Sequence, residues 1–73
     1  MTKTSELAHP DSCLNRAKDN EIVFVLLGRD IAASTAIRAW AAERIRLRKN
    51  IATDTQILEA LATANQIDKE TGK

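Results

Sequence analysis

Hydrophobic positions in the second half of the chain recur with the period of an α-helix. The spacing predicts one helix over residues 31–49 and a second over residues 54–68. The two would pack as an antiparallel hairpin joined near residues 50–52. The predicted inward positions are Ala33, Ala36, Ile37, Trp40 and Leu47 in the first helix, and Ile57, Ala60, Leu61, Ala64 and Ile67 in the second.

Polar residues at the ends of these two helices support their boundaries. Asp30 is a predicted N-cap of the first helix, and the cations Arg46, Arg48 and Lys49 suit its carboxyl end through the helix dipole. Residues 53–56, with the sequence TDTQ, have the form of a capping box at the start of the second helix.

The amino-terminal part is less regular. A short helix is predicted over residues 11–18, after Pro10 and with Asp11 or Ser12 as its cap, and Cys13, Leu14 and Ala17 would form its buried side. Residues 1–8 and 69–73 are polar and aperiodic, so we expect both ends to be flexible around a single helical domain of residues 9–68.

Between these parts lies the sequence EIVFVLLGRD, in which residues 22–27 are all apolar. Its β-branched and aromatic residues favour a strand, but no second segment of the chain has strand character. A helix over residues 20–28, capped by Asp19 or Asn20 and ended by Gly28, would satisfy its own hydrogen bonds. We therefore predict a helix here, with a strand that pairs across a dimer as the alternative.

The predicted fold class is all-α, a small bundle of three to four helices. A domain of 73 residues has room for one small core and cannot easily bury the whole of residues 22–27. We therefore expect a second copy, as a homodimer, or another protein to cover part of this run. The candidate protein-binding residues are Ile22, Phe24, Val25, Leu27 and Arg29.

Charge is uneven along the chain, although its net value is only +1. Residues 29–49 carry a net charge of +4, and Arg38, Arg46 and Lys49 would share one helix face. This face is an alternative candidate for binding nucleic acid through phosphates. The predicted helix over residues 54–68 is acidic, so it is unsuited to be the base-reading second helix of a helix-turn-helix motif. A basic face that is simply exposed to solvent explains the same charge pattern.

The sequence offers little chemistry for catalysis. His9 and Cys13 are four residues apart, but Pro10 places His9 outside the helix, so they do not form a base and nucleophile pair. One histidine, one cysteine and two glycines supply neither a metal-ligand pattern nor a phosphate-binding loop. We therefore predict a protein that is not an enzyme, with no catalytic residues, no cofactor, no metal and no small-molecule ligand.

The lone cysteine gives no sign of an oxidising compartment. The amino terminus lacks the apolar core of a signal peptide, and no window approaches the roughly 18 apolar residues of a membrane span. We expect a cytoplasmic protein that does not enter the membrane.

Several short patterns together resemble a set of small, uncharacterised proteins from phages, prophages and bacteria. The resemblance spans roughly residues 12–64, and this chain has Ile22 where such proteins often have proline. It implies an accessory protein of a mobile element and attaches no activity to it. The matching positions are Cys13, Ala17, Asp19, Glu21, Phe24, Val25, Leu26, Asp30, Trp40, Ala41, Glu59, Ala60 and Leu61.

Overall fold

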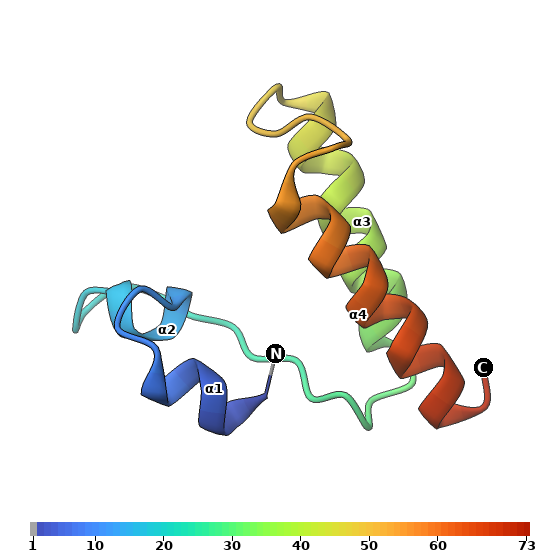
Figure 1. The fold of residues 1–73 in the computed structure, drawn as a ribbon, viewed down its shortest axis with the longest axis horizontal. Helices are drawn as coiled ribbons and strands as arrows, with labels where there is room; N and C mark the ends of the chain where they lie inside the picture. The colour runs from blue at the N-terminus through green and yellow to red at the C-terminus, as the bar shows by residue number, and fades with distance from the viewer. Residues whose placement is uncertain (1) are drawn as a thin grey trace.

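The computed structural model describes residues 2–73 and places four helices in that range, with no strand. They are α1 (Lys3–Ala8), α2 (Cys13–Arg16), α3 (Ala33–Arg46) and α4 (Thr55–Thr71) (Figure 1). The predicted all-α class is therefore confirmed. Among the described residues the helices pack in two pairs, α1 against α2 and α3 against α4, and a long open connection joins the pairs (Figure 1).

The hairpin of α3 and α4 contains the buried residues of the described chain. On α4 the predicted stripe is confirmed at four of its five positions, whereas Leu61 is exposed. On α3 only Ala33 of the predicted stripe is fully buried, because this helix has a single neighbour that covers a narrow strip of its surface. The buried set consists of Ala33, Ser34, Ala41, Ile57, Ala60, Ala64 and Ile67.

Both ends of α3 differ from the prediction. Asp30 lies in a turn before the helix, where its carboxylate Oδ1 accepts from Ala32 N at 2.9 Å, and the helix begins at Ala33. At the other end Arg48 adopts a left-handed backbone with φ 59°. Arg48 N and Lys49 N donate to the carbonyls of Ile45 and Arg44, both at 3.0 Å, which is the pattern of a Schellman motif. The helix therefore ends at Arg46, and Lys49 lies outside it.

The capping box predicted at residues 53–56 is wrong. Asp54 is the N-cap of α4, and its side chain makes no capping hydrogen bond. Its Oδ2 instead accepts from Asn50 Nδ2 at 2.9 Å and from Ile51 N at 3.0 Å, so it orders the interhelical loop. The Asn50 side chain and the Ile51 amide lower the pKa of Asp54.

Helical structure extends into both segments that were expected to be flexible. Thr2 and Ser5 cap α1 reciprocally, with Thr2 Oγ1 accepting from Ser5 N at 3.1 Å and Ser5 Oγ accepting from Thr2 N at 2.9 Å. At the other end α4 continues to Thr71 and stops at Gly72, whose φ is 74°.

Helix α2 is shorter than the predicted helix over residues 11–18, and it contains no buried residue. Asn15 Nδ2 donates to the backbone carbonyls of Glu6, Leu7 and His9 at 2.8–3.0 Å, which joins α2 to α1. The first pair of helices is therefore held by polar contacts rather than by an apolar core.

The helix predicted over residues 20–28 is wrong, because residues 22–27 form neither a helix nor a strand. Asp19 and Asn20 lie in a turn closed by Glu21 N, which donates to Lys18 O at 3.0 Å. A helix of this length is unfavourable in isolation, and β-branched Ile22, Val23 and Val25 weaken it further. No helix of the described chain packs against it to offset that cost.

Within residues 2–73, no helix is both long and apolar enough to cross a lipid bilayer.

Replacing Ile57 with alanine tests the hairpin core. Ile57 is 0% exposed, so we expect Ile57→Ala to lower the free energy of unfolding by about 2–5 kcal/mol. The neighbouring Leu58 is 53% exposed, and Leu58→Ala should change it by less than about 0.5 kcal/mol. Urea denaturation followed by circular dichroism measures both values, and equal losses would contradict this core.

Candidate protein-interaction surface

The most exposed large apolar side chains lie in the open connection between the two helix pairs. We call residues 22–27 the apolar segment. Ile22 is 96% exposed and Phe24 is 85% exposed, and the other four side chains of the segment are also exposed. Folded proteins rarely leave a contiguous apolar run in water unless it serves binding or assembly.

The backbone of the apolar segment is equally uncovered. Within residues 2–73, no backbone N–H or C=O of residues 22–26 forms a hydrogen bond with another backbone group. At its carboxyl end, Leu27 O accepts from Asp30 N at 3.0 Å in a turn. A β-prone run with free backbone groups on both edges is able to pair with another extended chain.

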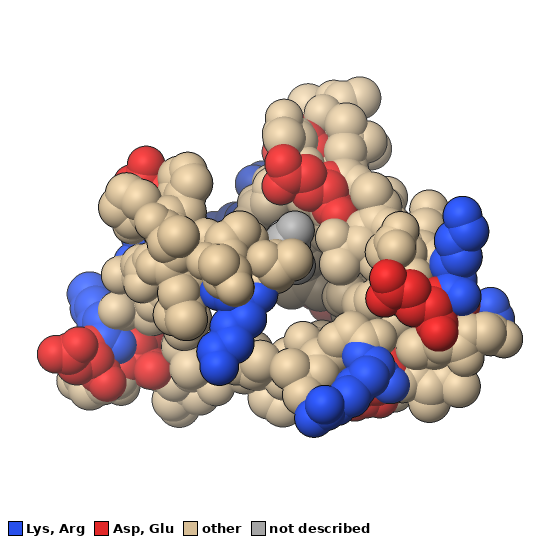
Figure 2. Space-filling model, turned by 60° about the horizontal axis from the view of Figure 1, so that its bottom comes forward, with Lys and Arg blue, Asp and Glu red and all other residues tan. Residues whose placement is uncertain are grey.

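The face that comes forward in Figure 2 carries charged side chains in separate positions. Uncharged surface lies between the Lys and Arg side chains there, and they do not gather into one basic patch (Figure 2). Binding to a polyanion relies on gathered cations, which this view does not show.

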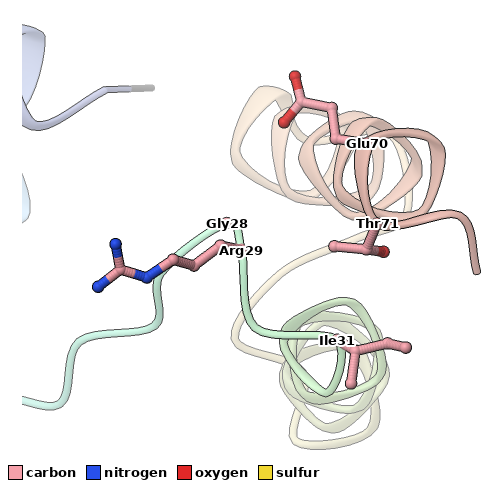
Figure 3. A pocket seen from close by; sticks show the side chains of 5 residues that line it. All are labelled: Gly28, Arg29, Ile31, Glu70 and Thr71. Atoms are coloured by element: carbon pink, nitrogen blue, oxygen red, sulfur yellow. The ribbon is translucent and has the colours of Figure 1, made fainter.

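Two open depressions flank the apolar segment. The first, of about 320 Å³, lies at its start and is lined by α2 and the residues that follow it, including Cys13, Arg16, Ile22 and Val23. The second, of about 450 Å³, lies just beyond its end and is lined by Gly28, Arg29, Ile31, Glu70 and Thr71 (Figure 3). The segment therefore spans the distance between a depression on the first helix pair and one on the hairpin.

Arg29 lies at the edge of the second depression. Its side chain extends away from α4, whose Glu70 and Thr71 form the opposite wall (Figure 3). Gly28 is close to the hairpin, since a Cβ added there would lie 3.8 Å from Ile67 Cγ1. The chain thus passes directly from the exposed segment to the hairpin surface.

The whole chain exposes more surface than a compact monomer of its mass. A chain of 8.1 kDa is expected to expose about 4,500 Å² when folded. This chain exposes 6040 Å², an excess of about 1,500 Å². Its radius of gyration of 12.9 Å likewise exceeds the roughly 11 Å of a compact domain of this length.

The three candidate nucleic-acid-binding residues do not form one free basic face. Arg38 Nη2 lies 2.7 Å from Asp68 Oδ2 and donates to Asn65 Oδ1 at 2.9 Å, so it joins α3 to α4. Arg46 is paired with Glu43. Lys49 follows the end of the helix and does not share its face.

The sequence pattern did not predict a group of polar contacts at the open end of the hairpin. Lys73, just beyond the end of α4, donates from Nζ to Thr35 Oγ1 at 2.6 Å, and the Arg38–Asp68 pair joins α3 to α4. Asp68 Oδ1 is buried without a hydrogen bond of ordinary geometry, but the Ser34 hydroxyl is close enough to affect it. The Ser34 hydroxyl and the Arg38 guanidinium lower the pKa of Asp68. Opposite charges on facing helices of the predicted hairpin are the signal that could have identified the ion pair.

His9 and Cys13 occupy separate environments. His9 Nδ1 accepts from Asp11 N at 3.2 Å, and the exposed Cys13 Sγ lies 3.7 Å from Arg16 Nη2. In the part of the chain that the structure describes, no three His, Cys, Asp or Glu side chains are grouped as metal ligands would be.

Comparisons with protein-family models, curated proteins and solved structures give no match to this chain.

The lowered pKa of Asp68 predicts a loss of stability in acid. Because its folded-state pKa is below the ordinary 3.8, its contribution is complete above that pH and is lost as the pH falls through the lower folded value. The free energy of unfolding should therefore fall more steeply below about pH 4 in the native chain than in Asp68→Asn or Arg38→Gln. Chemical denaturation at several pH values measures these slopes, and parallel curves for all three proteins would contradict the assignment.

Proposed function

We propose that this chain is a non-enzymatic interaction protein that binds another protein chain through residues 22–27. The observation that supports this is one continuous run in which both the apolar side chains and the backbone hydrogen-bonding groups are uncovered. Exposure of these apolar side chains to water does not stabilise the isolated chain.

Two kinds of interaction would contribute to binding. Burial of a large apolar side chain contributes about 1.5–3 kcal/mol, and Phe24 is the largest such group in the segment. Pairing of the free backbone with an extended chain adds hydrogen bonds that do not depend on sequence. Ordering each residue of the segment costs about 1–2 kcal/mol, so a stable complex requires both kinds of contact.

Charged residues border the apolar segment and would lie at the rim of the interface. Glu21 precedes it and Arg29 follows it, while Arg16 lines the depression at its start. Such rim charges set orientation and specificity more than affinity.

Nucleic-acid binding is not proposed, because Arg38 and Arg46 already pair with carboxylates and Lys49 lies apart from them. A cytoplasmic location and a relation to phage or prophage proteins stay predictions from the sequence.

Co-purification from the source cell tests the proposed function. A tagged chain is expressed there beside an untagged copy, and the retained proteins are identified by mass spectrometry. We expect Phe24→Ser to reduce retention of the bound chain at least tenfold, since a central aromatic residue commonly dominates binding.

Ile51→Ser is the matched control, because Ile51 is also apolar and 65% exposed but lies in the loop between α3 and α4. It should leave retention unchanged. If the native chain retains no protein, or if both variants lose binding equally, the proposed function is wrong.

A further inference from the structure

The residues on either side of the apolar segment make it complementary to itself. Glu21 lies four residues before Val25, and Arg29 lies four residues after it. When two such segments run antiparallel with Val25 facing Val25, Glu21 of each copy lies opposite Arg29 of the other. A parallel arrangement in register would instead place like charges side by side, which is unfavourable.

We propose that the partner is a second copy of this chain, and that the two apolar segments pair as an antiparallel two-stranded ribbon centred on Val25. This inference rests on the proposed function and identifies the bound protein. It accounts for part of the unpaired backbone of residues 22–26, because alternate residues gain hydrogen bonds from the other copy along one edge of the ribbon.

The side chains suit this register on both faces of the ribbon. Residues separated by two in sequence share a face. One face carries Val25 opposite its own copy and Val23 opposite Leu27. The turn that Asp30 N closes on Leu27 O extends on pairing, which places the Glu21–Arg29 pairs at both ends of this face. On the other face Phe24 lies opposite Leu26, and Ile22 lies opposite Gly28, which leaves space for the larger side chain.

The excess exposed area is large enough to supply a dimer interface. An excess of about 1,500 Å² per chain gives about 3,000 Å² for two chains, within the roughly 2,000–5,000 Å² of permanent homodimers. A two-stranded ribbon is only marginally stable by itself and requires a cover. The two-fold axis of an antiparallel pair brings both hairpins to the same face, and exposed Trp40 and Leu61 supply apolar surface for that cover.

Cysteine cross-linking tests the register directly. The variants are made in Cys13→Ser, because the native thiol is exposed. Val25→Cys places two thiols directly opposite each other, whereas two Leu27→Cys residues are about 13 Å apart along the ribbon, too far for a disulfide. Under a mild oxidant we expect the first variant to form the disulfide dimer at least tenfold faster than the second.

Exchange of the flanking charges tests the pairing without a cross-link. Arg29→Glu places carboxylates opposite each other at both ends and should raise the dimer Kd about tenfold. The double variant Glu21→Arg with Arg29→Glu again places opposite charges across the ribbon, now with the signs exchanged. Its dimer Kd should return most of the way to the native value. Light scattering over a range of concentrations measures Kd, and circular dichroism verifies that the helices remain.

The outcomes separate this inference from the proposed function. Equal cross-linking rates, or no recovery in the charge-exchanged double variant, overturn the antiparallel register. A chain that stays monomeric but retains another protein in a Phe24-dependent way overturns self-pairing and leaves the proposed function intact. A monomer that retains nothing overturns both.

Discussion

The contact between α3 and α4 is made mainly by alanines, with Ile57 and Ile67 as its large buried side chains. Small residues let two helices approach closely, but they remove little apolar surface from water. Since the helices of the described chain pack only in pairs, no other helix adds to this core. So narrow a packing surface explains why Phe24 is exposed, why the molecule is open and why no helix forms over residues 20–28.

Polar side chains fix how α3 and α4 lie against each other, which the small apolar core alone does not. Arg38 and Asp68 join the helices near one end, while the Asn50 side chain contacts Arg44 and Asp54 at the other. Arg44 also lies over the Trp40 ring, 5.8 Å from its centroid. Most of the arginines that the sequence suggested for phosphate binding therefore contact other groups of this protein.

The sequence predicted the elements whose stability is local or periodic. The buried side of α4 was identified because its apolar residues recur with the 3.6-residue period of a helix. They therefore lie on one side of α4, which is the side that α3 covers. Residues 22–27 could not be assigned in the same way, because their conformation depends on whether another element packs against them. The Thr2–Ser5 cap and the Arg38–Asp68 pair were missed since each depends on side-chain geometry or on register across the hairpin. For the candidate surface, the sequence identified residues 22–27 from apolarity alone but gave no information on their free backbone.

The central claim is that residues 22–26 are unpaired in one copy and gain their hydrogen bonds from another chain. Amide hydrogen exchange measured by NMR at rising protein concentration tests it most directly. At low concentration these amides should exchange almost as fast as in an unfolded peptide, while amides of α3 and α4 stay protected. At concentrations where two copies associate, alternate amides of residues 22–26 should slow at least tenfold. Strong protection of the segment in the dilute monomer, or none at any concentration, would contradict the account.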